Sequence, residues 1–330
     1  ILPAGGGFGL RGEAAHVTDA VLLSKALKRP VKVMYTREDD FANDYFRPAS
    51  QSRIKAGLDK DGRLVAWSHK VAAPSVWARI NPQRVKNGVC SDAVSGTRDM
   101  PYSIPNHRVD YVMVNLPIPV GFWRSVGFSV NALAVESFMD ELAHAAGKDP
   151  VQFRLAHMEK GSRPYNILSL LAEKSGWDRP VPADRARGVA VNACFESFAA
   201  HMAEVSVAAN GAVTVHKIVC AIDCGTAVYP DAIRAQAEGG AIMGLSTALH
   251  ERVRFENGGV KTLNYDDYPV VTMSEVPAIE VHIAESRLKA GGVGEPVLPS
   301  VAPAVANAIF KATGVRLREM PFQRELLVKG

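Results

Sequence analysis

The sequence predicts an α+β protein built as two lobes of mixed sheet and packed helices. Segments with the two-residue period of strands and segments with helical spacing occur in both halves of the chain. Hydrophobic residues make up 47% of the 330 residues, which is enough for a large core. Residues 161–187 are rich in Pro, Arg and Asp, so we expect a linker there, between lobe 1 (1–160) and lobe 2 (188–330).

Lobe 1 opens with a glycine-rich loop at residues 5–9, and residues 14–27 then carry apolar side chains at helical spacing. Residues 31–36 predict a short strand. Residues 53–73 predict a hairpin, because strand-like segments flank an Asp-Lys-Asp-Gly turn. Pro, Gly, Asn and Ser dominate residues 74–105, which we therefore expect to form a long loop.

The remainder of lobe 1 is expected to be one strand followed by helices. Residues 108–116 alternate as a strand does and lead into a loop at 117–128. Ser129 is the expected N-cap of an amphipathic helix that Gly147 ends. Asp149 and the proline after it predict the start of the next helix.

Lobe 2 is expected to begin with a meander of three strands and to end with a helix at 301–313. Residues 231–249 predict a helix with small apolar residues on all sides, which is typical of a buried helix. A further strand is expected at 279–284. The meander strands are expected at 188–198, 201–208 and 212–222, with an Asn-Gly hairpin turn between the last two.

Charge and cysteine content exclude several classes of protein. The formal charge of +4 is spread over 38 basic and 34 acidic residues without a basic block, so no nucleic-acid interface is expected. The four cysteines and nine histidines match neither zinc nor iron–sulfur spacing, which predicts no metal ligated directly by the chain. The chain begins Ile-Leu-Pro-Ala just before the glycine loop, and we expect a fragment or one piece of a split subunit.

Two loops are candidates for binding an anionic ligand. The glycine loop permits close backbone approach and is followed by the free N–H groups of a helix start, although a tight structural turn would look the same. Arg124 also lies in a loop that feeds directly into a helix. Its neighbours Phe122 and Trp123 are expected either to wall an apolar pocket or to serve only in packing.

Two further positions carry polar groups in unusual settings. Gln236 and Glu238 interrupt the apolar helix at 231–249, so they need partners, either neighbouring backbone or a ligand with many donors and acceptors. Glu295 stands between Gly294 and Pro296, an arrangement that leaves the preceding backbone free and holds the glutamate extended. Such a glutamate either projects into a cleft or is an ordinary exposed loop residue.

Read in order, these segments resemble the molybdenum-cofactor domain of the xanthine oxidase family, and in particular isoquinoline 1-oxidoreductase large subunits and bacterial molybdenum aldehyde dehydrogenases. The resemblance covers nearly the whole chain. The matching segments are GGGFG at 5–9, RPV at 29–31, TRED at 36–39, IPN at 104–106, NLP at 115–117, WR at 123–124, DCG at 223–225, QAEGG at 236–240, GL at 244–245 and GVGEP at 292–296.

The resemblance implies a role for each matching residue. Glu295 would be the general base of a hydroxylation that uses water. The cofactor would be held by the backbone of Gly7, Phe8 and Gly9, by Arg124 on the opposite wall, and by Gln236. It would be molybdopterin with molybdenum, in its cytosine dinucleotide form. The substrate pocket would include Trp123 and Val126.

Departures from the family pattern are informative. The family's second active-site glutamate falls on Gly12, with Glu13 one place late, which argues against purine-type orientation of the substrate. Val126 replaces a common aromatic residue. The chain also lacks the long segment with a Glu-Met-Gly-Gln-Gly motif between the lobes. In relatives of the isoquinoline 1-oxidoreductase type that segment lies in the N-terminal half, so we expect part of the cofactor wall to come from there.

The sequence thus predicts part of the catalytic subunit of a bacterial molybdenum hydroxylase that acts on an aldehyde or an N-heteroaromatic carbon. The alternatives are a homologue adapted to another substrate class, or a non-catalytic remnant that only binds a partner subunit. The resemblance implies as partners the N-terminal half of the subunit or a second chain, a small subunit with 2Fe-2S clusters, and a c-type cytochrome subunit. We expect the isolated chain to be inactive, and the complete protein to be periplasmic or membrane-associated.

Overall fold

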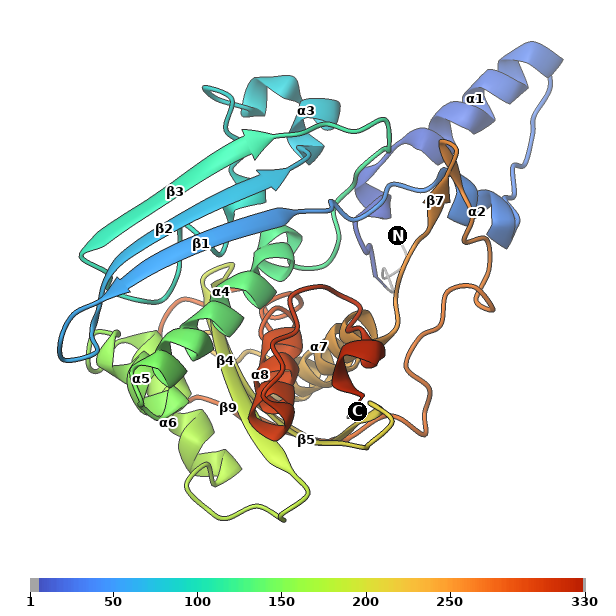
Figure 1. Ribbon diagram of the computed structural model, residues 1–330. Helices are drawn as coiled ribbons and strands as arrows, with labels where there is room; N and C mark the ends of the chain where they lie inside the picture. The colour runs from blue at the N-terminus through green and yellow to red at the C-terminus, as the bar shows by residue number, and fades with distance from the viewer. Residues whose placement is uncertain (1–5, 329–330) are drawn as a thin grey trace.

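The computed structural model describes residues 6–328, which form two main sheets with helices around them (Figure 1). The first sheet has the order β1-β2-β3, with β1 antiparallel and β3 parallel to β2. The second has the order β4-β5-β6-β9, antiparallel except for β6 and β9. The strands are β1 (Gln51–Leu58), β2 (Leu64–Ala73), β3 (Asn106–Met113), β4 (Ala186–Cys194), β5 (Ser197–Val207), β6 (Val213–Asp223), β7 (Phe255–Glu256), β8 (Gly259–Val260) and β9 (Ala278–Ile283).

Helices cover both faces of the second sheet. α8 packs against β4 and β5 on one face, while α6 packs against β5 and β6 on the other. Alternate strand residues serve the two faces: Ala190 belongs to the core under α8, and Val189 and Val191 to the core under α6. The helices are α1 (Ala15–Leu27), α2 (Arg37–Asn43), α3 (Val76–Ile80), α4 (Val126–Ala145), α5 (Pro150–Ala156), α6 (Arg163–Ser175), α7 (Pro230–Leu249) and α8 (Val301–Thr313), with short 3-10 turns between them.

Helix α4 connects the two sheets, since it contacts β1 of the first, β4 of the second, and α8 (Figure 1). Its buried Glu136 accepts hydrogen bonds from the Tyr102 hydroxyl (2.5 Å), the Arg154 guanidinium (3.0 Å) and the Val191 amide (3.0 Å). A buried carboxylate is tolerated only when it is paired and hydrogen-bonded in this way. One buried cluster of hydrogen bonds around Glu136 therefore joins residues from both halves of the chain.

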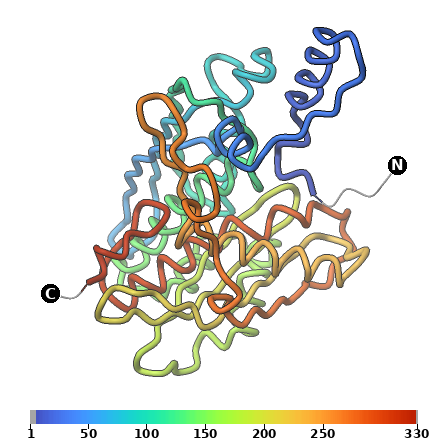
Figure 2. Tube along the Cα trace, turned by 90° about the vertical axis from the view of Figure 1, so that its right-hand side faces the viewer, coloured from blue at the N-terminus to red at the C-terminus, as the bar shows by residue number. Residues whose placement is uncertain are grey.

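Helix α1 stands apart from this packing. It projects from the rest of the molecule beside α2 in both views (Figures 1 and 2), and none of its residues is buried. Val21 and Leu22 remain 58% and 57% exposed although both are apolar. The apolar side chains of a helix normally pack against another element. The surface of α1 therefore lacks packing partners within residues 6–328.

The structure confirms the predicted hairpin, the meander, the 149–150 helix start and the closing helix. The predicted strand at 31–36 is wrong, because these positions follow α1 at the surface and pair with no strand of the described residues. Ser129 is not an N-cap: α4 begins earlier, at Val126, and the Ser129 hydroxyl donates to the Val126 carbonyl (2.9 Å). The segment 161–187, expected as a linker, contains α6, whose apolar face packs on the second sheet.

No helix within residues 6–328 combines the length and hydrophobicity that crossing a membrane requires. The division into two lobes, 1–160 and 188–330, stays a prediction.

Candidate active site

A cavity of ≈ 400 Å³ lies where the glycine loop, the start of α4, α7 and the loop before α8 meet. Every residue to which the resemblance assigns a role lines this cavity, although these residues are up to 288 positions apart in the sequence, and Glu238 does not line it. The lining residues are Gly6, Gly7, Phe8, Gly9, Phe122, Trp123, Arg124, Val126, Ala235, Gln236, Gly239, Gly294 and Glu295. The roles of these residues stay predictions, but the fold does bring them together around one cavity.

Arg124 joins three of these segments. Its Nε donates to the Gly294 carbonyl (2.6 Å), and its Nη2 donates to both the carbonyl and the side-chain Oε1 of Gln236 (3.1 Å each). Burial lowers the pKa of Arg124, while the nearby Glu295 carboxylate opposes that shift. A guanidinium has a pKa far above neutrality, so Arg124 brings a fixed positive charge to the cavity.

Glu295 is bound by the residue after Arg124. The Ser125 amide donates to Glu295 Oε1 (3.1 Å), and the Ser125 hydroxyl donates to the Glu295 carbonyl (2.6 Å). One residue further on, the Pro296 carbonyl accepts a hydrogen bond from the side chain of Asn192 on β4 (3.1 Å). The loop that carries Glu295 is thus tied to both lobes.

The glycine loop contacts the α4 side through backbone atoms. A Cβ placed on Gly9 would lie 1.8 Å from the Phe122 carbonyl oxygen, and Gly9 has a φ of +92°, so only glycine fits there without strain. Phe8 also has a positive φ, of 49°. Among the acceptors of residues 6–328, none takes the N–H of Phe8 or of Gly9.

Helix α7 contributes its exposed side. Gln236 and Glu238 are exposed, so the prediction that they form a buried polar pair in a fully buried helix is wrong. The opposite side of α7 packs closely: a Cβ on Gly240 would lie 2.7 Å from the Val297 side chain. The small residues therefore bring α7 close to the segment that follows Glu295, and Gly239 leaves space on the cavity side.

Glu13 takes no part in the lining. Its carboxylate forms an ion pair with both terminal nitrogens of Arg79, and the Arg79 Nε donates to the Val120 carbonyl (2.8 Å). The Arg79 guanidinium also stacks on the Tyr45 ring, 3.9 Å from its centroid. These contacts hold Glu13 outside the cavity, and Glu295 is the carboxylate that lines it within the described residues.

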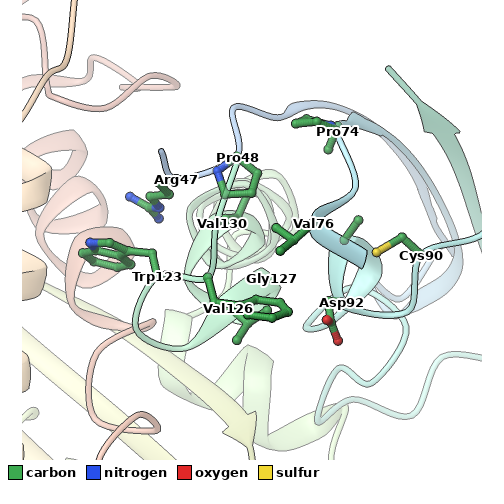
Figure 3. Close-up of a pocket in the computed structure, with 14 residues that line it drawn as sticks. Arg47, Pro48, Pro74, Val76, Cys90, Asp92, Trp123, Val126, Gly127 and Val130 are labelled. Atoms are coloured by element: carbon green, nitrogen blue, oxygen red, sulfur yellow. The ribbon is translucent and has the colours of Figure 1, made fainter. Parts of the chain in front are cut away.

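A second, smaller cavity lies beside Trp123 and Val126, the two residues predicted for the substrate pocket (Figure 3). Phe122, Trp123 and Val126 line both cavities, and Val76, Cys90 and Val130 give the small one an apolar surface. Its ≈ 30 Å³ has room for only about two water molecules. Arg47 lies 4.4 Å above the Trp123 ring (Figure 3), and burial lowers the pKa of Arg47 to about 10.

Metal-ligating residues do not gather anywhere in residues 6–328, since no group of three or more His, Cys, Asp or Glu side chains could hold an ion there. The four cysteines are buried free thiols.

Sequence reasoning missed Ser125, Asn192 and Arg47. Ser125 could have been identified from the sequence, because it directly follows Arg124 of the WR motif. Asn192 lies in a strand and Arg47 in a loop, and neither position carries a signal in the sequence that connects it with Glu295 or Trp123.

Comparison with known proteins agrees with this geometry. Two models, each described as "Molybdopterin cofactor-binding domain", match residues 2–158 and 134–277. Isoquinoline 1-oxidoreductase subunit beta of Brevundimonas diminuta is 36% identical over 98% of the chain and 42% of its own length. The membrane-bound aldehyde dehydrogenase (pyrroloquinoline-quinone) of Gluconacetobacter polyoxogenes is 34% identical over 99% of the chain and 46% of its own length.

The fold is also that of a solved enzyme. The aldehyde oxidoreductase from Desulfovibrio desulfuricans superposes with a TM-score of 0.82 at 17% identity, over 98% of this chain and 53% of that one. These matches define the class of protein, one that carries molybdopterin cofactor-binding domains. The chain belongs to the xanthine oxidase family and is similar to the molybdopterin-binding subunits of its oxidoreductases. It spans less than half the length of the two relatives named above.

Proposed function

We propose that this chain is part of the catalytic subunit of a molybdenum hydroxylase, which oxidatively hydroxylates an aldehyde or an N-heteroaromatic carbon with water as the source of oxygen. The observation that carries the proposal is the convergence of Phe8, Arg124, Gln236 and Glu295 on one cavity. The names of the relatives support both substrate classes, one being an isoquinoline oxidoreductase and the other an aldehyde dehydrogenase.

The donors at the cavity fit molybdopterin, which is an anionic ligand rich in hydrogen-bond acceptors. The backbone N–H groups of Phe8 and Gly9 would contact the ligands of the metal, and Arg124 would supply positive charge across from them. Gln236 would contact the pterin, beside the open space at Gly239. We propose the cytosine dinucleotide form. When bound, this cofactor accepts two electrons from the substrate.

Glu295 would serve as the general base. Its Oε1 already accepts the Ser125 amide, so the second carboxylate oxygen is the one available to take a proton from the attacking oxygen of water. Arg124 holds the carbonyl of the preceding residue, which fixes the direction of the glutamate. Positioning and proton transfer are therefore the chemical contributions of this chain.

The substrate would lie against Trp123 and Val126. Because Glu13 is paired with Arg79, the cavity offers a substrate no second carboxylate within the described residues, and an uncharged, largely apolar molecule fits it best. The small cavity behind Trp123 is too closed for a ring, so a large substrate would require Trp123 or Val126 to move.

The complete enzyme would need further polypeptide, either the N-terminal half of the same subunit or a second chain, to complete the cofactor wall. We propose that electrons then pass to a small subunit with 2Fe-2S clusters and onward to a c-type cytochrome subunit. The isolated chain would be inactive for lack of these partners, and a periplasmic or membrane-associated location would suit the cytochrome.

The test is elemental analysis of the purified complete enzyme by plasma emission, combined with turnover in water labelled with oxygen-18. We expect molybdenum at one atom per catalytic subunit and the label in the product. An enzyme without molybdenum would contradict the proposal in favour of a subunit-binding remnant, or of the quinone cofactor that the name of the second relative gives.

A further inference from the structure

We propose that Ser125 is a positioning residue that fixes Glu295 through two hydrogen bonds and so turns one oxygen of its carboxylate toward the cavity. This inference rests on the proposed role of Glu295 as the base. Ser125 does not line the cavity itself, so it would act only through the glutamate.

Both polar atoms that Ser125 can donate from are directed at the same residue. The backbone amide donates to Oε1 of the Glu295 side chain (3.1 Å), whereas the hydroxyl donates to its main-chain carbonyl (2.6 Å). Two contacts at opposite ends of one glutamate restrict both its backbone and its side chain. Ser125 has no exposed surface, so water has no room to replace the hydroxyl if it is removed.

The backbone at this point is strained. Ser125 has a φ of +72° and Val126, which is β-branched, has a φ of +49°. A left-handed conformation is unfavourable for a non-glycine residue, and strain of this kind persists only where surrounding contacts fix it. Glycine would adopt the same φ at position 125 without cost. A serine there keeps the strain and adds the hydroxyl bond to Glu295.

The neighbouring contacts show why the orientation matters. Arg124 binds the Gly294 carbonyl and Asn192 binds the Pro296 carbonyl, so the residues on either side of Glu295 are already fixed. Ser125 supplies the missing restraint on Glu295 itself. A base must lie within hydrogen-bond reach of the proton that it takes, and a misplacement of about 1 Å costs on the order of 100-fold in rate.

The test compares Ser125→Ala and Ser125→Gly in the complete enzyme by single-turnover reduction with substrate. Both variants keep the amide bond to Oε1 and lose the hydroxyl bond to the Glu295 carbonyl. We expect this loss to lower the first-order rate roughly 10- to 100-fold, with molybdenum content and substrate affinity close to wild type. Ser125→Gly should unfold at a higher temperature than Ser125→Ala, because it relieves the positive φ. Ser129→Ala is the matched control with a wild-type rate, since its hydroxyl bonds only to Val126 within α4.

A double variant separates this inference from the proposed function. If Ser125 acts through Glu295, adding Ser125→Ala to Glu295→Gln causes no further loss of rate. If Glu295→Gln is inactive but both Ser125 variants keep a rate within twofold of wild type, the role of Ser125 is overturned and that of Glu295 is not. A fully active Glu295→Gln would overturn the proposed function as well.

The crystal structure of Ser125→Gly provides a readout independent of activity. We expect the Glu295 carboxylate in a changed or mixed orientation while Arg124 stays in place. An unchanged Glu295 side chain, or loss of molybdenum from both Ser125 variants, would overturn the inference, because Ser125 would then hold the fold and not the base.

Discussion

The two walls of the cavity are held in different ways. The wall formed by the start of α4 and the loop that carries Glu295 is cross-linked by side-chain hydrogen bonds from Arg124, Ser125 and Asn192. The wall formed by the glycine loop, which precedes α1 in the chain, rests on backbone contacts such as that of Gly9 with Phe122, and Phe8 is 68% exposed. The first wall is therefore fixed by side-chain hydrogen bonds within residues 6–328, and the second is more exposed.

The helices behind the two walls show the same difference. α8 and α1 each have 13 residues and both are rich in apolar side chains, yet α8 buries its residues from Val301 to Ile309 and α1 buries none. A Cβ on Gly188 of β4 would lie 2.2 Å from the backbone of α8, which shows how closely this helix is packed. Apolar composition alone therefore does not decide which helix stabilises the chain.

The largest expected effect concerns stability. Ile309→Ala in α8 should lower the free energy of unfolding by about 2–5 kcal/mol, because it leaves a cavity in a closed core. Leu22→Ala in α1 should change it by less than about 0.5 kcal/mol, since this side chain is 57% exposed. Urea denaturation of both variants of this chain measures the difference. Equal losses would show that α1 is packed in solution.

The next effect concerns the exposed wall and the cofactor. Gly9→Ala should weaken cofactor retention by about 1–3 kcal/mol, roughly 5- to 150-fold, because the new methyl group collides with Phe122 at a positive φ. Gly12→Ala is the control, since its Cβ would meet no atom within 4 Å and Gly12 does not line the cavity. The measurement is molybdenum content of the complete enzyme after dialysis. Equal retention by both variants would mean that the glycine loop does not hold the cofactor.

The smallest expected effect is a pH dependence of the folding stability, which arises from a buried histidine behind the wall that carries Glu295. His201 binds the Ser300 hydroxyl, which in turn binds Asn192, and burial lowers the pKa of His201 to about 3. An unfolded histidine has a pKa of about 6.5. The folded state therefore stays neutral where the unfolded state binds a proton, and stability is lost as the pH falls from about 6.5 toward about 3.

Unfolding free energies of wild type and His201→Gln at pH 7 and pH 5 test this linkage. The variant should be less stable at pH 7 but should show the shallower loss on acidification, with one proton fewer taken up on unfolding. Parallel pH profiles for the two proteins would rule out His201 as the titrating group.

Most of the fold was open to prediction from the sequence, because strand and helix periods, the Asn-Gly turn and the Asp-Pro helix start are local signals. The strand expected at 31–36 failed, since a strand requires a pairing partner that the local sequence does not reveal. The start of α4 was misplaced because the positive φ of Ser125 and Val126 is imposed by contacts with distant residues. Gln236 was expected in a buried helix, and only the three-dimensional packing shows which side of α7 is open.

The site residues themselves were predictable only as a set. Glu295 alone resembles an exposed loop glutamate, and its connection to Ser125 spans 170 positions in the sequence. The order of the motifs along the chain carried the prediction. The residues that fix Glu295, Ser125 and Asn192 among them, follow from geometry alone.

The most direct measurement is single-turnover reduction of the complete enzyme by substrate, comparing wild type with Glu295→Gln at matched molybdenum content. The glutamine keeps the shape and can still accept the Ser125 amide, but it cannot take a proton. General-base catalysis is typically worth about 10²–10⁴ in rate, and we expect a loss at or above the upper end of that range with molybdenum retained. A variant that keeps more than about a tenth of the wild-type rate would contradict the assignment of Glu295 as the base.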